Sequence, residues 1–218
     1  MRSGLPAAPR VVGSLIVTSS SATRGWLKLG NLMFPCALGR TGIHARKREG
    51  DGATPAGVWP LRCVRYRADR VRRPRTVLPT RALSRDDGWC DAPGDRNYNR
   101  LVMHPYPASA ERLWRADGLY DVLVVLDYNE RPRVRGRGSA IFMHVAQPHF
   151  APTQGCIALT QVHLVRLLER LGARAAVCVG MAVRKKRPKP ALRALRARRA
   201  RGVLKQAARG WSASRAAS

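Results

Sequence analysis

Short apolar runs, each closed by Gly, Pro or Asn, restrict the fold of this chain more than any other feature. Runs of this length and spacing are typical of β-strands, because a helix needs a longer periodic segment. We expect early strands at Ser14–Thr18, 25–29 and 32–38, and Gly30-Asn31 between the last two predicts a hairpin turn. The segment 47–66 begins with turn residues and ends in another strand-like run. The first part of the chain is therefore predicted to be β-structure.

Longer apolar runs in the second half of the chain complete the predicted strands. DVLVVLDYN (121–129) suits a central strand, GRGSAIFMHVA (136–146) is a second, and ARAAVCVG (173–180) is the expected closing strand. Side chains alternate between the two faces of a strand. The segment 136–146 therefore presents Ile141, Met143 and Val145 on one face, and Ala140, Phe142, His144 and Ala146 on the other.

One helix is expected between the last two strands. Thr160 is suited to cap it, Leu171 would end it, and Gly172 is the stop. The apolar residues Leu164, Val165, Leu168 and Leu171 would share one side of this helix. Residues 69–100 are rich in Arg, Pro and Asp and predict a long, loop-rich insertion. The fold class is therefore α+β, mainly β.

The charge of the chain is strongly basic and unevenly distributed. Lys and Arg number 41 and Asp and Glu 13, a net charge of +28, which favours anionic partners such as nucleic acid, anionic lipid or a cell-wall polymer. Residues 184–218 hold 13 of the basic residues and no acidic residue. We expect a loose leader at 1–13, a folded domain at 14–183 and a disordered basic tail at 184–218. The tail is interpreted as a solvated extension, with an electrostatic anchor as the alternative.

Cysteine usage and hydropathy limit the remaining classes. The five cysteines are an odd number without a Cys-x-x-Cys pair, so a disulfide framework, a zinc ribbon and a thioredoxin-type motif are not indicated. No apolar run approaches the ~20 residues that span a bilayer, so no transmembrane segment is expected. The N-terminal apolar stretch is broken by Gly13 and Ser14 and makes a poor signal peptide.

The stretch HVAQPHFAPTQGCIAL (144–159) contains the main candidate for chemistry. His144 ends the predicted strand, and Cys156 lies in a loop that we expect directly before the helix. An adjacent imidazole lowers the pKa of a thiol and makes it a nucleophile. Gly155 would let a substrate carbonyl approach the N–H groups around 154–156, which could stabilise an oxyanion. From these residues alone, a catalytic pair and an inert buried pair both remain open.

Two alternatives use other residues of this region. A metal site could draw on His144, His149, Cys156 and His163. Their spacing lacks a tight chelating pair, so a metal site is not favoured. Cys90 is a second thiol in a polar stretch, flanked by Asp86, Asp87 and Asp91. Nearby carboxylates raise the pKa of a thiol, which argues against a nucleophile there. Trp89, Tyr98 and Asn99 could line a groove or simply form a structured loop.

Two motifs of the chain together resemble the YkuD-type L,D-transpeptidases. FMHVA…TQGCIALT resembles the catalytic motif of that family, namely a strand-borne His, a loop, Ser or Thr, a variable residue, Gly-Cys and an aliphatic residue. The matching positions are His144, Thr153, Gln154, Gly155, Cys156 and Ile157. EGDGATPAGVWPL (49–61) resembles the upstream Thr-Pro-x-Gly-aromatic segment through Thr54, Pro55, Gly57 and Trp59. A compact bacterial branch of the family is most similar, through Trp89–Asp91 and Tyr98–Arg100.

The resemblance covers about 14–182 and implies a fold, a site and an activity. It implies a mixed β-sheet sandwich or barrel with one helix after the catalytic cysteine. Cys156 would be the nucleophile and His144 the base, without any metal or organic cofactor. Substrate contacts would come from Gly155, Gln154, Thr153, Tyr98 and Asn99. The chain departs from many relatives at Gln154, where they have His, and at Ala158, where they have Arg or Asn.

The implied activity is acyl transfer on peptidoglycan stem peptides through a thioester, and so a place in the cell envelope or periplasm. Hydrolysis by the same site, an L,D-carboxypeptidase reaction, is one alternative. The basic surface suits an anionic wall polymer as partner. The rival from another class is a nucleic-acid-binding protein with a degenerate YkuD fold, which would bind through the basic tail.

Overall fold

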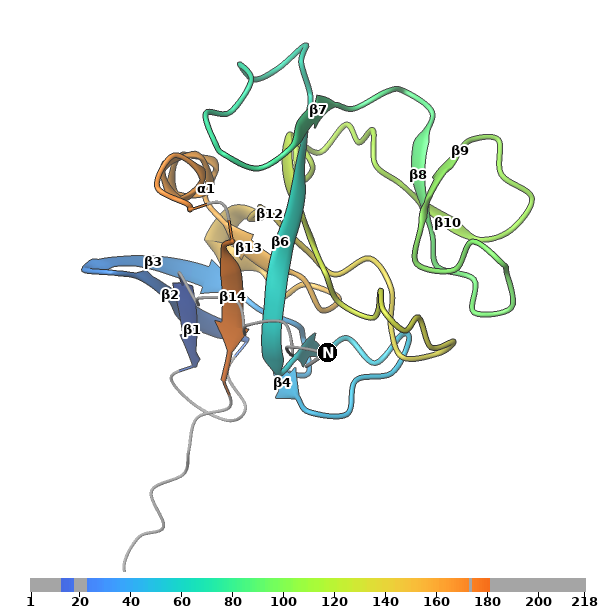
Figure 1. Cartoon of the computed structure of the whole chain (residues 1–218), viewed down its shortest axis with the longest axis horizontal. Helices are drawn as coiled ribbons and strands as arrows, with labels where there is room; N and C mark the ends of the chain where they lie inside the picture. Colours follow the sequence, from blue (N-terminus) through green and yellow to red (C-terminus); the bar gives the residue numbers. More distant parts are fainter. Residues whose placement is uncertain (1–12, 18–22, 173, 181–218) are drawn as a thin grey trace, which may run out of the picture. The chain divides into compact units, whose positions relative to one another are not determined.

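The computed structural model describes residues 13–17, 23–172 and 174–180. The tail expected at 184–218 and all but the last residue of the leader expected at 1–13 lie outside the described residues. Strands dominate the described part of the chain (Figure 1). They are β1 (Gly13–Val17), β2 (Arg24–Leu29), β3 (Leu32–Ala37), β4 (Ile43–His44), β5 (Thr54–Pro55), β6 (Gly57–Tyr66), β7 (Thr80–Ala82), β8 (Asp87–Cys90), β9 (Leu101–Met103), β10 (Ala110–Arg112), β11 (Val122–Leu126), β12 (Phe142–Val145), β13 (Ile157–Leu159) and β14 (Ala176–Val179). A 3-10 turn, η1 (Pro148–Phe150), and one α-helix, α1 (Gln161–Leu168), complete the described elements. The predicted α+β class, mainly β, is therefore confirmed.

The main sheet closes on itself through hydrogen bonds. Its strand order is β11-β12-β13-β3-β2-β1-β14-β6-β7, and β11 also pairs with β6. The pairing is mixed, because β1–β14, β12–β13 and β6–β7 are parallel whereas the other pairs are antiparallel. The long strand β6 permits closure, since its first residues pair with β14 and its later residues pair with β11 (Figure 1).

The hairpin predicted at Gly30-Asn31 is confirmed. β2 and β3 pair in antiparallel fashion, with Leu29 opposite Leu32 across the turn. Gly30 has a φ of +58°, a left-handed conformation that suits a residue without a Cβ.

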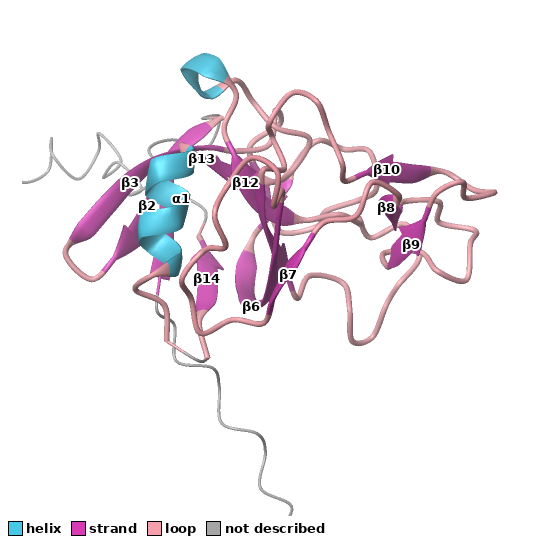
Figure 2. Cartoon of the chain, turned by 90° about the horizontal axis from the view of Figure 1, so that it is seen from above, coloured by secondary structure: helices cyan, strands magenta, loops and turns pink. Residues whose placement is uncertain are grey.

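Apolar cores cover both faces of the adjacent strands β11 and β12. One core contains Val122, Val124, Leu126, Ile141 and Met143, together with residues of α1, which packs against both strands (Figure 2). The other contains Leu123, Val125, Phe142 and Cys156. The predicted central strand and the predicted two faces of 140–146 are therefore confirmed. The strand at 136–146 is shorter than expected, because Gly136, Gly138 and Ala140 have positive φ angles that interrupt an extended chain.

The helix begins where the sequence predicts but ends earlier than expected. Thr160 caps it, with its hydroxyl accepting from the His163 N–H at 3.3 Å, as predicted. However, α1 ends at Leu168, because the Arg170 and Leu171 N–H groups donate to carbonyls three residues back. The loop expected between Cys156 and the helix is instead largely a strand. The three residues of β13 intervene and pair with β12 and β3, a run too short for periodicity to reveal.

The region expected to be a loop-rich insertion contains more structure than predicted. β7 extends the main sheet, and β8 lies in the middle of a small antiparallel sheet of order β10-β8-β9. This sheet lies beside the main one (Figure 1). The burial of Trp89, Leu113 and Tyr120 against β11 and β12 fixes it there. These strands are only three or four residues long and therefore carry no recognisable periodicity, which explains why the sequence did not predict them.

Candidate active site

His144 and Cys156 line one cleft of about 540 Å³, referred to below as the Cys156 cleft. Its lining comprises Glu49, Gly50, Asp91, Glu111, Arg115, Leu119, Tyr120, Ser139, Ala140, His144, Gln147, Ala151, Pro152, Thr153, Gln154, Cys156 and Ala158. His144 is on β12, and Cys156 directly precedes β13. The two strands are adjacent and parallel, with His144 opposite Ala158. The sheet therefore brings together two residues that are twelve positions apart in the sequence.

The imidazole of His144 is held in the tautomer that a base requires. Its Nδ1 lies 2.8 Å from the Val145 carbonyl oxygen. Because a carbonyl only accepts, Nδ1 carries the proton and Nε2 is left as an acceptor. The ring is 5% exposed and packs edge-on against Tyr120, with centroids 5.3 Å apart. Burial lowers the pKa of His144 to about 4, so the ring is neutral at neutral pH.

The thiol of Cys156 is also neutral in this structure. Burial is the main cause that raises its pKa to about 12, and the Glu111 carboxylate raises it further, against the Phe142 N–H and Lys47. The Sγ atom donates to the Ala140 carbonyl at 3.2 Å and accepts from the Phe142 N–H at 3.4 Å. The expectation that the imidazole lowers this pKa is therefore not met. A nucleophilic role for this thiol would require proton transfer to accompany attack by the sulfur rather than precede it.

Tyr98 and Asn99, expected to contact substrate, lie behind the wall of the Cys156 cleft. They are 1% and 3% exposed and are not among its lining residues. The Asn99 side-chain oxygen accepts from the Ala140 N–H at 3.1 Å, and its amide donates to the Tyr128 carbonyl at 3.0 Å. The Tyr98 hydroxyl donates to Glu49 and accepts from the Gly138 N–H. Both residues therefore support the 138–140 segment, whose Ala140 carbonyl accepts from the thiol.

The loop before Cys156 is shaped by Thr153 and Gly155. The Thr153 hydroxyl donates to the Cys156 carbonyl at 2.6 Å and accepts from the Gly155 N–H at 3.1 Å. That leaves the Cys156 N–H, for which the described residues provide no acceptor. Gln154 lines the cleft, and its side-chain oxygen accepts from Arg40 at 3.0 Å. The Cys156 N–H is therefore unpaired among the described residues, next to a thiol that lines the cleft.

The upstream Thr-Pro-x-Gly-Trp segment packs against this loop. Gly155 has a φ of +131°, and a Cβ there would lie 2.6 Å from the Ala53 carbonyl oxygen. The Thr54 hydroxyl is buried and accepts from the Gly39 N–H at 2.8 Å, and Gly39 forms a bridge with Thr153. The Trp59 indole N–H donates to the Pro55 carbonyl at 3.0 Å. The two sequence motifs are therefore one structural unit around the cysteine.

His149 and His163, the other candidate metal ligands, do not line the Cys156 cleft. His149 is in η1, and its carbonyl accepts from Arg24. The His163 ring packs on Phe34 with centroids 5.3 Å apart. Across the described residues, no group of three or more His, Cys, Asp or Glu side chains is arranged to hold a metal ion. Cys90, the second candidate thiol, is fully buried. Burial is the main cause that raises its pKa, and the charges of Asp95 and Asp91 raise it further, as the sequence predicts.

Sequence reasoning missed two residues that influence the cysteine. Glu111, on β10, accepts from the Tyr120 hydroxyl at 2.5 Å, and burial raises the pKa of its carboxyl. Lys47 is 7% exposed, and its ammonium lies 3.3 Å from the position of a Cβ on Gly155. It donates to Asp51 at 2.7 Å. A single Glu or Lys in a loop-rich region carries no sequence signal, because only the fold brings it to the site.

The comparisons agree with the geometry of the site. The family model of the YkuD L,D-transpeptidase catalytic domain matches residues 13–183. The chain matched no curated protein and no solved structure. Among the described helices, none is long and apolar enough to cross a membrane. Because the family match covers most of the sequence and includes both motifs, the chain belongs to the YkuD family of L,D-transpeptidase catalytic domains.

Proposed function

We propose that this chain transfers acyl groups on peptidoglycan stem peptides, with Cys156 as nucleophile and His144 as base. The observation that carries the proposal is the shared cleft, which is lined by both Cys156 and His144, whose neutral imidazole has an unprotonated Nε2. A neutral thiol and a neutral imidazole suit general-base catalysis. Membership of the family supplies the substrate class.

The first half of the reaction forms a thioester. Nε2 of His144 accepts the thiol proton as Sγ attacks the carbonyl carbon of the amide between the third residue of the stem and its terminal D-residue. A C–S bond forms, and the carbonyl oxygen becomes an oxyanion. The C–N bond then breaks, and the imidazolium returns its proton to the departing amine. The Cys156 N–H, which has no acceptor within the described structure, is a suitable donor to the oxyanion.

The second half transfers the acyl group to an acceptor. An amine of a neighbouring stem peptide gives up a proton to His144 and attacks the thioester, so that an amide forms and the Cys156 thiol is released. Water at the same position would yield the carboxylic acid, which is L,D-carboxypeptidase activity. The cell envelope follows from this substrate as the proposed place of action.

Mass spectrometry with a disaccharide-tetrapeptide tests the proposal. The wild-type protein is expected to gain the mass of the donor less the terminal D-residue on Cys156, and then to release a crosslinked dimer. Cys156→Ala should form neither adduct nor dimer. His144→Gln should slow acylation by about a hundredfold or more, in line with the usual contribution of a general base. Turnover retained in Cys156→Ala would end the proposal.

A further inference from the structure

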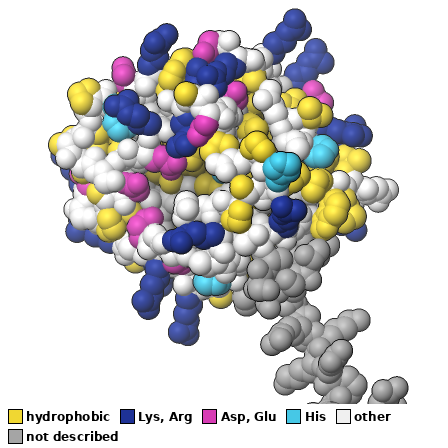
Figure 3. Space-filling view, turned by 180° about the vertical axis from the view of Figure 1, so that it is seen from behind, with side chains coloured by type: hydrophobic (Ala, Val, Ile, Leu, Met, Phe, Trp, Pro, Cys, Tyr) yellow, Lys and Arg dark blue, Asp and Glu magenta, His cyan; other side chains and the backbone are white. Residues whose placement is uncertain are grey.

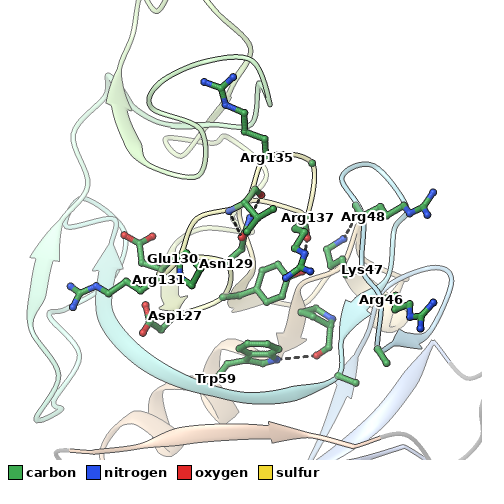
Figure 4. A pocket seen from close by; sticks show the side chains of 17 residues that line it. Arg46, Lys47, Arg48, Trp59, Asp127, Asn129, Glu130, Arg131, Arg135 and Arg137 are labelled. Atoms are coloured by element: carbon green, nitrogen blue, oxygen red, sulfur yellow. Dashed lines mark hydrogen bonds between the residues drawn. The ribbon is translucent and has the colours of Figure 1, made fainter. Parts of the chain in front are cut away.

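A second and larger cavity, of about 730 Å³, lies next to the Cys156 cleft and takes no part in the mechanism above. Figure 4 shows this cavity from close by. It is referred to below as the basic pocket, because its lining includes Arg46, Lys47, Arg48, Arg131, Arg135 and Arg137. In Figure 4, Arg131 lies on the opposite side of the cavity from Arg46 and Arg48, and Trp59 lies at its base. The side chains of Arg46, Arg48, Arg131 and Arg135 extend outward in this view, so the positive charges encircle the mouth of the cavity.

The five arginines of the basic pocket carry uncompensated charge. The two acidic residues of its lining are already neutralised from outside it. Arg62 lies 3.8 Å from Asp127 and 3.2 Å from Glu130, and Arg133 lies 2.6 Å from Glu130. The guanidinium groups of Arg46, Arg48, Arg131, Arg135 and Arg137 are exposed and form no salt bridge to any described residue. Elsewhere the surface is mixed, and Figure 3 shows a face on which several Asp and Glu side chains lie among the Lys and Arg.

Hydrogen bonds hold both arms of the basic pocket in place. On one side, the Asn129 amide donates to the Val134 and Gly138 carbonyls, each at 2.9 Å, and its oxygen accepts from the Val134 N–H at 2.9 Å. On the other side, the Lys47–Asp51 ion pair fixes the turn that carries Arg46 and Arg48. The arginines therefore project from a preformed backbone, which lowers the ordering cost of binding.

The basic pocket and the Cys156 cleft share a wall. Residues 45–48 line the basic pocket, whereas the next two residues, Glu49 and Gly50, line the cleft. A second segment, 134–140, is divided in the same way. Residues 134–137 line the basic pocket, and Ser139 and Ala140 line the cleft. The Glu49 N–H donates to the Gly136 carbonyl at 2.8 Å and joins the two segments. A ligand in the basic pocket would therefore lie close to one in the cleft.

We propose that the basic pocket binds the carboxylate groups of a second wall peptide, the acceptor strand, beside the donor in the Cys156 cleft. The proposal rests on the proposed function, because acyl transfer needs two peptides on one enzyme at the same time. The planar guanidinium group matches a carboxylate in bidentate geometry. Five separate arginines match carboxylates spread along a chain, and the partly buried Trp59 and Ala56 provide apolar contact between them.

Calorimetry on the inactive Cys156→Ala protein tests the binding step. The ligand is a disaccharide-tripeptide with free carboxylates, which lacks the scissile bond, and its amidated form is the comparison. The triple variant Arg131→Gln, Arg135→Gln, Arg137→Gln is expected to weaken binding of the free-carboxylate ligand about tenfold or more, since each exposed pair contributes up to about 1 kcal/mol. The control removes the same charge elsewhere, through Arg72→Gln, Arg73→Gln and Arg75→Gln, three exposed residues outside the pocket. It should change binding by less than about twofold, because such distant charges are screened.

Several outcomes would overturn the proposal. Equal weakening of ligand binding by both triple variants would mean that binding depends on the overall positive charge of the protein and not on the pocket. Equal binding of the amidated ligand would exclude carboxylate recognition. A third such outcome is that duplex DNA or inorganic phosphate binds more tightly than the peptide. If the pocket variant alone abolished that binding, the site would be assigned to phosphate groups.

The active enzyme separates failure of the basic pocket from failure of the proposed function. With donor and acceptor present, the pocket variant should form the acyl-enzyme at the wild-type rate but release more hydrolysed and less crosslinked product. Normal acylation with an unchanged product ratio would reject the pocket and keep the proposed function. Absence of any acyl-enzyme in the wild type would reject the proposed function, and the binding comparison would still decide on the pocket.

Discussion

The carbonyl oxygen of Ala53 occupies the space that a side chain on Gly155 would need. The two are in different motifs, a hundred residues apart, yet a Cβ on Gly155 would lie only 2.6 Å from that oxygen. The φ of +131° is a further obstacle to any other residue. The glycine before Cys156 is therefore required for packing.

Gly155→Ala is accordingly expected to impair both stability and acylation. The strained φ and the contact with Ala53 should destabilise the fold by about 1–3 kcal/mol. Displacement of the loop should slow acylation of Cys156 by more than about tenfold, because misplacement of a nucleophile by 1 Å can cost a hundredfold. Urea denaturation and acyl-enzyme mass spectrometry measure the two effects. Gly30→Ala is the matched control, since Gly30 has a φ of +58° and open space around its Cβ position. It should lose stability without loss of acylation, and equal loss of acylation in both variants would contradict the argument.

The neutral state of the Cys156 thiol predicts how its reactivity depends on pH. With a pKa of about 12, its alkylation by iodoacetamide should stay slow at pH 7 and increase up to at least pH 10. An ion pair with His144 would instead give a plateau that begins near pH 4–6. Enzymatic acylation should differ from alkylation, because His144 with a pKa of about 4 is already a base at pH 5 and above. The rate of enzymatic acylation should therefore be nearly constant between pH 5 and 9. A fall in this rate centred near pH 6.5 would refute the lowered pKa of His144.

Glu111→Gln tests the electrostatic contribution of that carboxylate. The Glu111 carboxylate raises the pKa of Cys156, so its neutral isostere should lower that pKa and speed alkylation at pH 8 by several-fold. The side-chain oxygen of Gln can still accept from the Tyr120 hydroxyl, which leaves the local packing in place. Asp86→Asn, at an exposed position outside the cleft, is the control and should leave the alkylation rate unchanged. An unchanged rate in Glu111→Gln would remove Glu111 from the electrostatics of the site.

The sequence predicted the candidate pair, which the structure places in one cleft, but only part of its surroundings. His144 and Cys156 could be identified because strand alternation, motif spacing and the upstream Thr-Pro segment all pointed to one corner. Those signals are local, or they come from the resemblance to the family. Lys47, Glu111 and Ala140 influence the thiol through contacts between distant segments, and nothing in their immediate sequence indicates such contacts.

Secondary-structure elements were also predicted where the signal is local and missed where it depends on long-range contacts. The hairpin at Gly30-Asn31 and the strand at 121–129 follow from turn chemistry and hydrophobicity, and both are present. β13 was missed because three apolar residues cannot show a period, and its pairing with β12 and β3 is a long-range property. Tyr98 and Asn99 were expected to contact substrate because their segment resembles one found in the family and could line a groove. The small β10-β8-β9 sheet, which the sequence did not reveal, accounts for their burial.

Asn99→Ala distinguishes support from substrate contact. The change removes the acceptor of the Trp89 and Ala140 N–H groups and the donor to the Tyr128 carbonyl. Unpaired buried groups of this kind cost about 1–3 kcal/mol each, so the free energy of unfolding should fall by at least about 2 kcal/mol. Because Asn99 lies outside the cleft, kcat should fall while KM for the donor changes little. A raised KM with unchanged kcat would instead place Asn99 in contact with the substrate.

His144 also predicts a dependence of stability on pH. Its pKa falls from 6.5 to about 4 on folding, so the unfolded chain binds the proton more tightly than the folded one. The contribution of His144 to the free energy of unfolding is therefore fully present above pH 6.5. About 3 kcal/mol of this free energy is lost as the pH falls towards 4. His144→Gln removes this proton linkage. The difference in Tm between pH 7 and pH 4.5 should be several degrees smaller in the variant than in the wild type, because about 1 kcal/mol shifts Tm by 2–4 °C in a domain of this size. The same difference in both proteins would mean that His144 is protonated as easily in the folded state as in the unfolded one.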